Sequence, residues 1–351
     1  MTLISARRNT WWGPCALVSA LLAAAPVMAA DDAREWLAKM NDALTGRNYD
    51  GTFMHLSSEG RVETMRIVHR VRAGRVTERL QSLDGSGREF VRNNDELTCY
   101  LPDQHTVLVQ PRQSRGPVLG SLPQFGAEST EVYRIESLPA ARVLNRPVHV
   151  ISVNPKDQFR FGYRLWLDEK TAMPLKTQLC DSRGNIIEQI LFARLDMPEN
   201  IADSELTPAV STEGMRLVRQ GPPRDNAAPS VLSAFRATEL PPGFHLTAEG
   251  AQILGGASAP ASHLVYSDGL ATVSVFVEAQ RGPGPDPAAG GAPADPPLQG
   301  LARVGSGFAF STVIQGHQVT AVGEVPAQTV EFIAHSVRVY GNTAGAPPPQ
   351  H

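Results

Sequence analysis

The sequence predicts a mostly antiparallel β protein of the α+β class, in which a large open half-barrel wraps over one helix and a smaller antiparallel sheet is backed by one helix. Three observations predict this fold. Runs of alternating apolar and polar residues recur along much of the 351-residue chain. Turn signals separate these runs at intervals of about 8 to 12 residues, as in an antiparallel meander. Helical spacing of apolar residues occurs near the two ends, and one helix on a long sheet favours a curved sheet or an open barrel.

The first 29 residues have the pattern of a secretory signal peptide. Arg7 and Arg8 precede an apolar run of about 14 residues, which starts at Cys15 and ends in small residues before a cleavage site after Ala29. The run is shorter than the about 20 residues that span a bilayer, which disfavours a transmembrane anchor. The pattern therefore predicts an exported protein, with a bacterial periplasm as its destination.

Residues 30–200 are predicted to form the half-barrel domain. A helix opens it, because four apolar residues from Trp36 to Leu44 recur at helical spacing, behind an Asp31–Asp32 cap and ahead of Gly46. Period-two alternation then predicts two strands around Phe53 and Met65. Further strands are expected over these ranges: Leu97–Leu101, Thr106–Gln110, Arg146–Val153, Phe159–Asp168, Leu175–Cys180 and Asn185–Leu195.

The chain beyond residue 200 is predicted to form a linker and a small domain. Residues 201–230 are rich in proline, asparagine and aspartate, which is linker composition. In residues 231–340, Asp268-Gly269 joins two alternating runs as a hairpin, and Pro326 opens a helix. Residues 281–300 form a flexible glycine- and proline-rich insertion, and residues 341–351 a disordered tail.

Charge and cysteine content limit the kinds of partner. Cleavage of the signal peptide removes two arginines, so the mature chain has 30 basic and 35 acidic residues. This balance argues against nucleic acid as a partner. Two cysteines remain, Cys99 and Cys180, each within a predicted strand. In an oxidising compartment they can form a disulfide, or equally well pack as two free thiols.

The sequence lacks the motifs of enzymes and metalloproteins. It has no G-x-S-x-G nucleophile motif, no phosphate-binding glycine loop and no histidine or cysteine cluster at metal-ligand spacing. Acidic pairs such as Asp168-Glu169 are explained by turns. We therefore expect no enzymatic activity, no cofactor and no metal.

Long strings in both predicted domains resemble the MucB/RseB family. They are NYDGTFMHLSSEGRVETMRIVHRV from Asn48, ERLQSLDGSGREFVRNNDELTCYLPD from Glu78, RLWLDEKTAMPLKTQLCDSRG from Arg164, and HLVYSDGLATVSVFVE with GHQVTAVGEVPAQTV in the second domain. The resemblance extends from about Asp32 to Val339. The insertion at 281–300 departs from the family pattern, so nothing is transferred to it.

The resemblance implies a periplasmic negative regulator of an envelope-stress sigma factor. The large domain would resemble the lipoprotein carriers LolA and LolB. The small domain would contact the periplasmic part of a membrane anti-sigma factor of the MucA/RseA kind and shield it from the site-1 protease. Lipid-bearing signals, such as lipopolysaccharide or lipoproteins, would displace the regulator. A homo-oligomer is compatible with this role, and the membrane would be reached only through the partner.

Two groups of residues are candidates for these contacts, and the alternative for each residue is ordinary strand core. The predicted lipid pocket contains Phe53, Met65, Phe161, Leu165 and Phe192. The predicted partner surface contains Val273, Val275 and Phe276. The alternative function is a periplasmic lipid or lipoprotein carrier of the LolA type. A carrier needs only the half-barrel, so the second domain distinguishes the two.

Overall fold

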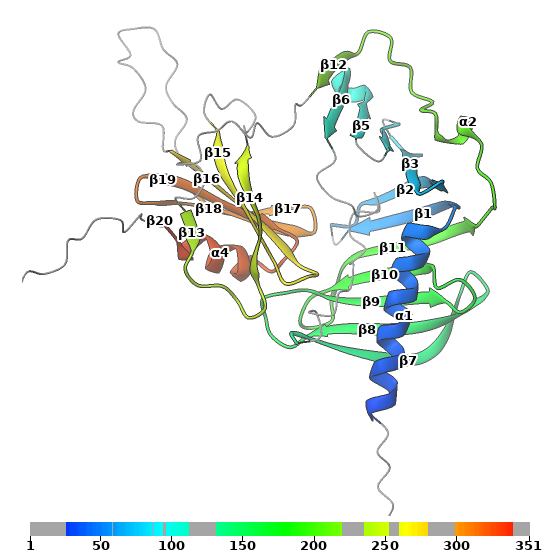
Figure 1. The fold of residues 1–351 in the computed structure, drawn as a ribbon, viewed down its shortest axis with the longest axis horizontal. Coiled ribbons are helices and arrows are strands. Elements are labelled where there is room, and N and C mark those ends of the chain that lie inside the picture. Colours follow the sequence, from blue (N-terminus) through cyan, green and yellow to red (C-terminus); the bar gives the residue numbers. More distant parts are fainter. Residues whose placement is uncertain are drawn as a thin grey trace, which may run out of the picture.

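The computed structural model describes most of the chain as two β-sheets, each with a helix packed on one face (Figure 1). The described residues are 26–57, 59–85, 87–93, 96–111, 131–219, 235–252, 260–279 and 299–339. Residues 1–25 of the predicted signal peptide, most of the insertion at 281–300 and the tail at 341–351 lie outside them.

The large domain is a 12-stranded open sheet built from two meanders. Its strand order is β12-β6-β5-β4-β3-β2-β1-β11-β10-β9-β8-β7, and every neighbouring pair is antiparallel except β12 with β6. The bounds are β1 Tyr49–Ser57, β2 Val62–Arg72, β3 Arg75–Ser82, β4 Glu89–Arg92, β5 Glu96–Leu101, β6 Thr106–Pro111, β7 Tyr133–Val143, β8 Arg146–Pro155, β9 Gly162–Asp168, β10 Pro174–Cys180, β11 Ile186–Asp196 and β12 Arg216–Arg219.

Helix α1 (Pro26–Gly46) packs on one face of this sheet (Figure 1). Its residues Leu37, Met40 and Leu44 are buried in one core cluster with alternate residues of the strands. Each such buried side chain stabilises the fold by about 1.5–3 kcal/mol. The helix and the curved, open sheet together confirm the predicted half-barrel.

The small domain is a 6-stranded antiparallel sheet with the order β14-β15-β16-β19-β18-β17. Helix α4 (Ala327–Ser336) covers one face, and its Val330, Ile333 and Ala334 are fully buried there. A short pair of strands, β13 (Phe235–Ala237) and β20 (Val337–Val339), flanks it. The remaining bounds are β14 His245–Gln252, β15 Ala261–Ser267, β16 Thr272–Ala279, β17 Gly300–Val304, β18 Gly307–Ile314 and β19 His317–Gly323. The predicted fold class is thereby confirmed.

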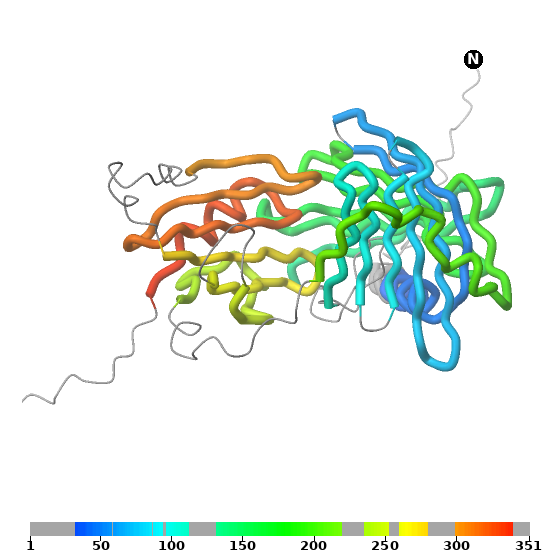
Figure 2. Tube along the Cα trace, turned by 90° about the horizontal axis from the view of Figure 1, so that it is seen from above, coloured from blue at the N-terminus to red at the C-terminus, as the bar shows by residue number. Residues whose placement is uncertain are grey.

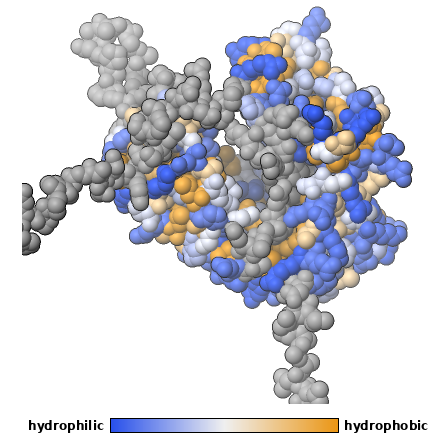
Figure 3. Space-filling model, in the orientation of Figure 1, coloured by the Kyte–Doolittle hydropathy of each residue, from blue (hydrophilic) through white to orange (hydrophobic). Residues whose placement is uncertain are grey.

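The two domains lie side by side, as Figures 1 and 2 show from perpendicular directions. On the face shown in Figure 3, hydrophobic residues form separate patches on both domains between larger hydrophilic areas. The described chain contains no helix that is long and apolar enough to cross a membrane.

Several local predictions differ from the structure. Helix α1 begins at Pro26, so Asp31 and Asp32 lie within it rather than at its cap. The region predicted as a linker is partly ordered on the large domain, because residues 203–206 form the short helix α2 (Asp203–Leu206) and residues 216–219 form β12. The predicted strand from Phe159 begins only at Gly162. Strands β3, β4, β7, β12, β13, β14, β17 and β20 were not predicted.

The two cysteines are not joined by a disulfide. Cys99 lies in β5 and Cys180 in β10, and both are buried free thiols. Strands β4, β3, β2, β1 and β11 separate these two strands in the sheet, whereas a disulfide needs Cα atoms within about 7 Å. The second alternative left by the sequence, two packed thiols, is the one found.

Candidate functional site

The five predicted pocket residues belong to one apolar cluster between α1 and the large sheet. Phe53 pairs with Met65 on one side and with Phe192 on the other, and the rings of Phe53 and Phe192 lie 5.5 Å apart. Leu165 and Phe161 lie in and just before β9, further along the same cluster. All five are at most 9% exposed. In this conformation they form packed core.

Gly51 shows how closely this region is packed. A Cβ atom at this position would lie 2.5 Å from Cε1 of Phe192, so the Phe192 ring can pack against β1 only because residue 51 is glycine. An acyl chain at these positions would have to displace side chains or helix α1.

The three predicted partner residues lie on opposite faces of strand β16. Val273 and Val275 are completely buried in the small domain's core, in the same cluster as Val330 of α4. Phe276 points to the other face, where it is partly exposed and stacks on His263 with ring centroids 4.5 Å apart. Of the three, Phe276 alone has surface to offer to a partner.

The most developed polar site is one that sequence reasoning missed, at the joint between the two domains. Its centre is Arg160, whose side chain is completely buried. Its Nε and Nη2 atoms each donate to a different oxygen of Asp157, both at 3.0 Å. Its Nη1 donates to Oδ2 of Asp268 in the small domain at 2.6 Å, and Nη2 also donates to the carbonyl oxygen of Pro242. A buried charge requires such complete pairing.

Asp268 lies at the tip of the β15–β16 hairpin, and its carboxylate bonds both to the hairpin's own turn and to residues of the large domain. Its Oδ1 accepts hydrogen bonds from the backbone N–H groups of Leu270 and Ala271, at 2.9 and 2.7 Å, which shapes the turn. Its Oδ2 accepts from Arg160 and, at 3.1 Å, from the hydroxyl of Tyr133 in the large domain. The hairpin tip is therefore anchored in the neighbouring domain.

Two aromatic rings and a glycine complete this anchor. The guanidinium carbon of Arg160 lies 5.5 Å from the ring centroid of Tyr133 and 5.2 Å from that of Phe244. Burial, followed by the charge of Asp268, raises the pKa of Tyr133, so its hydroxyl remains a donor. Gly243 has a positive φ of 79°, and a Cβ there would lie 2.8 Å from Cγ1 of Val132. We call Asp157, Arg160 and Asp268, with Tyr133 and Phe244, the interdomain anchor.

Helix α4 makes a second contact across the joint. The hydroxyl of Thr329 donates to the carbonyl oxygen of Phe159 at 2.7 Å, and the side chain of Gln328 donates to that of Gln158. The rings of Phe159 and Phe332 meet edge to face at 5.5 Å. Residues 157–160, just before β9, thus contact the small domain through the charged side chain of Arg160 and the apolar ring of Phe159.

A third contact gathers titratable groups. Glu324 follows β19 of the small domain and accepts a hydrogen bond from Ser306. Burial is the main cause that raises its pKa to about 7, and the charge of Glu188 on β11 adds to the effect. Nε2 of His55 lies 3.0 Å from Oε1 of Glu188, which raises the pKa of that histidine. Ionisation of Glu324 therefore brings a second negative charge towards Glu188 across the joint.

Within the described part of the chain, no cluster of three or more histidine, cysteine, aspartate or glutamate residues could hold a metal ion. The sequence did contain signals for the anchor, namely the Asp157 and Arg160 spacing and the Asp268-Gly269 turn. Nothing in the sequence, however, indicated that residues 108 positions apart would meet.

Comparisons with known proteins agree with this two-domain architecture. The sequence profile of the MucB/RseB N-terminal domain matches residues 32–210, and that of the MucB/RseB C-terminal domain matches residues 230–338. Together the two profiles match well over half of the chain.

Individual relatives match over nearly their whole length. The sigma factor AlgU regulatory protein MucB of Pseudomonas aeruginosa is 32% identical over 90% of this chain and 94% of its own. The sigma-E factor regulatory protein RseB of Salmonella typhimurium is 27% identical over 93% of this chain and 97% of its own. In the solved complex of Pseudomonas aeruginosa MucA and MucB, the matching chain is 28% identical with a TM-score of 0.64, covering 88% of this chain and 99% of that one.

Proposed function

The chain belongs to the MucB/RseB family, and from this premise we propose that it is a periplasmic regulator that binds the periplasmic domain of a MucA/RseA-like anti-sigma factor. By holding this partner, it restrains the envelope-stress sigma factor that the partner sequesters. Its role is binding rather than catalysis, in line with relatives that are named as regulatory proteins.

The observation that carries the proposal is the match over both domains to a protein solved in complex with MucA. The likeness covers 99% of that chain, so it includes the small domain as well as the half-barrel. This also favours a regulator over a lipid carrier of the LolA type, which would need the half-barrel alone.

We further propose that bound regulator shields the partner from the site-1 protease. On the small domain, Phe276 is the proposed contact, because it is partly exposed beside His263. Val273 and Val275 support the same strand from its buried face. An aromatic side chain of this kind is a frequent source of binding energy at protein interfaces.

Release by a lipid-bearing signal requires a ligand that binds the free regulator better than the partner-bound one. We propose that an acyl chain enters the apolar cluster around Phe53 and Phe192 and changes the angle between the domains at the interdomain anchor. A tenfold loss of partner affinity needs only about 1.4 kcal/mol of coupling. Two buried methylenes, at about 0.8 kcal/mol each, supply that amount.

Calorimetric titration with the purified periplasmic fragment of the anti-sigma factor tests the binding proposal. We expect saturable one-site binding, weakened at least tenfold by Phe276→Ala. The matched control is Ser274→Ala on the same face of β16, which we expect to leave the affinity within twofold. Absence of binding by the unmodified chain would refute the proposed function. Equal affinities for the two variants would refute only the contact.

A further inference from the structure

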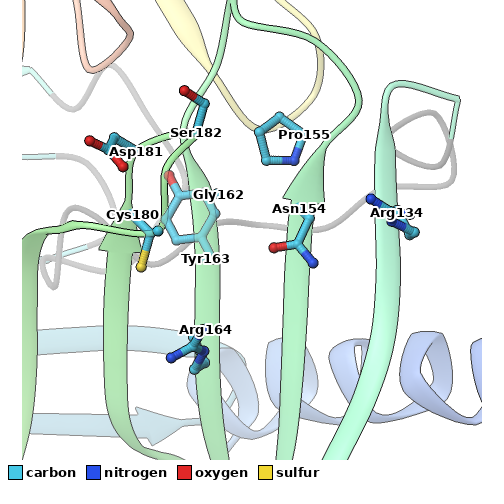
Figure 4. A pocket seen from close by; sticks show the side chains of 10 residues that line it. Arg134, Asn154, Pro155, Gly162, Tyr163, Arg164, Cys180, Asp181 and Ser182 are labelled. Atoms are coloured by element: carbon cyan, nitrogen blue, oxygen red, sulfur yellow. The ribbon is translucent and has the colours of Figure 1, made fainter.

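A hollow of about 230 Å³ lies on the large sheet near one end of β7 to β10, and nothing in the proposed function uses it (Figure 4). Its lining is mostly polar. The residues that matter here are Arg134, Asn154, Gly162, Arg164, Cys180 and Ser182.

The hollow faces away from the apolar cluster and helix α1. Side chains alternate between the two faces of a strand. Ile135, Val153 and Leu165 belong to the buried cluster, so their neighbours Arg134, Asn154 and Arg164 point to the outer face. The hollow is therefore separate from the predicted lipid pocket.

A glycine opens the floor of the hollow. Gly162 pairs with Cys180 on β10, and a Cβ atom at Gly162 would lie 3.8 Å from the Cα atom of Asn154 on β8. A Cβ at Gly162 would lie 2.8 Å from the carbonyl oxygen of Val153, so this position does not accept a side chain. The missing side chain leaves a depression between Asn154 and Cys180.

Two guanidinium groups give the hollow a positive charge. Within the described residues, Arg164 has no ion pair. Arg134 lies only loosely against Glu136, with its Nε 3.9 Å from the carboxylate. The two arginines lie on β7 and β9, where Arg134 pairs with Asn154 and Arg164 pairs with Ser152 on the intervening β8. Two strand spacings and this offset along the strands separate them by about 12 Å, a span that two arginine side chains bridge.

The carboxylate in the lining is already engaged in its own turn. Oδ1 of Asp181 accepts from the backbone N–H groups of Arg183 and Asn185, both at 2.8 Å, and Oδ2 accepts from the Asn185 side chain. These bonds lower the pKa of Asp181, most of all the one from the Asn185 side chain. Asp181 therefore closes one wall, while two arginines outnumber it in charge.

We propose that this hollow is a binding site for a phosphomonoester. Two guanidiniums on separate strands approach an anion from two directions, which suits the several oxygens of a phosphate, whereas one arginine fork already satisfies a carboxylate. Asn154 and Ser182 add neutral polar groups. The volume is nearly eight times the roughly 30 Å³ that a water molecule occupies in the liquid. It fits a small phosphorylated head and lies below the roughly 300–1,000 Å³ of sites for drug-sized ligands.

Titration with glycerol 3-phosphate at low ionic strength tests the site, and glycerol and acetate serve as uncharged and carboxylate references. We expect saturable binding of the phosphate ester alone, weakened at least tenfold by Arg164→Gln and abolished by Arg164→Gln with Arg134→Gln. Arg142→Gln is the matched control, because Arg142 lies on the same strand as Arg134 and bonds only within its own turn. Melting curves check that each variant is folded.

Flotation with vesicles distinguishes the source of the phosphate. Vesicles containing phosphatidic acid expose a phosphomonoester, and vesicles with enough phosphatidylglycerol to give the same surface charge do not. Binding to the former that inorganic phosphate competes away supports a lipid headgroup. Binding of soluble esters without flotation supports a free phosphate ester. Absence of phosphate binding, equal binding of acetate, or a double variant that binds like Arg142→Gln would overturn the proposal.

Discussion

At the scale of single residues, Arg160 is the side chain that most clearly joins the two domains. Four of its five N–H groups donate hydrogen bonds to the carboxylates of Asp157 and Asp268 and to the carbonyl oxygen of Pro242, and the rings of Tyr133 and Phe244 lie nearby. The sequence predicts that Arg160 belongs to an alternating strand from Phe159 to Asp168. The regular strand begins only at Gly162, so that alternation does not extend back to Arg160. A contact between distant segments cannot be derived from local periodicity.

Replacing this arginine should be strongly destabilising. Arg160→Met leaves the carboxylate of Asp268 buried without its partner, and breaking a buried ion pair in this way costs about 3–5 kcal/mol. We expect urea unfolding to show a loss of that order, together with separation of the two domains' transitions. Arg142→Met, at the exposed end of β7, should change stability by less than about 0.5 kcal/mol. A loss below about 1 kcal/mol for Arg160→Met would mean that the anchor contributes little.

Glu324 should make the domain joint sensitive to pH. Its pKa is raised to about 7 in the folded protein, from an ordinary value of 4.5, so the folded state binds more protons in this interval. Its contribution to stability is then fully present below about pH 4.5 and is lost as the pH rises through about 7. His55, whose pKa is also raised, acts in the same direction.

We therefore expect the folded protein to be less stable at pH 8 than at pH 6, as measured by urea unfolding in buffers of equal ionic strength. Glu324→Gln should flatten most of this difference, because the amide stays neutral. The matched control is Glu331→Gln on helix α4, a partly exposed glutamate. An unchanged pH profile in Glu324→Gln would contradict the role assigned to this carboxyl group.

At the scale of elements, the sequence predicts those whose side chains follow a strict period. Strands β1, β2 and β8 to β11, and helices α1 and α4, have a buried stripe that alternation or helical spacing reveals. Strand β7 was not predicted, because Pro139 and a register shift between Leu138 and Ala141 interrupt the alternation of its apolar residues. Strands β14 and β17 are largely exposed, so neither has a clear apolar face. Strand β12 forms only by pairing with β6 across a long separation.

Helix α1 should be held mainly by its buried stripe. Leu37→Ala creates a cavity against the large sheet, and we expect a loss of about 2–5 kcal/mol in the free energy of unfolding. Lys39→Ala, a neighbouring and exposed position on the same helix, should cost less than about 0.5 kcal/mol. Equal effects of the two substitutions would show that the helix does not depend on its apolar face.

At the scale of the whole molecule, the contacts between the two domains include the interdomain anchor, the N-terminal end of α4 and the carboxyl groups of Glu324 and Glu188. The fold class and the two-domain division are accessible from the sequence, because each sheet has its own apolar core. The joint is not, because its groups come from segments that lie far apart in the sequence, such as those of Tyr133, Arg160 and Asp268. Among the predicted site residues, Phe276 has a surface position, and the lipid-pocket residues are packed core in this conformation.

The proposed role depends on the regulator protecting its partner. The direct measurement is the initial rate of site-1 protease cleavage of the anti-sigma factor's periplasmic fragment, with and without saturating regulator. We predict at least a tenfold lower rate with the unmodified chain, and recovery of cleavage when Phe276→Ala replaces it at the same concentration. Undiminished cleavage of a fragment that is demonstrably bound would contradict the shielding mechanism.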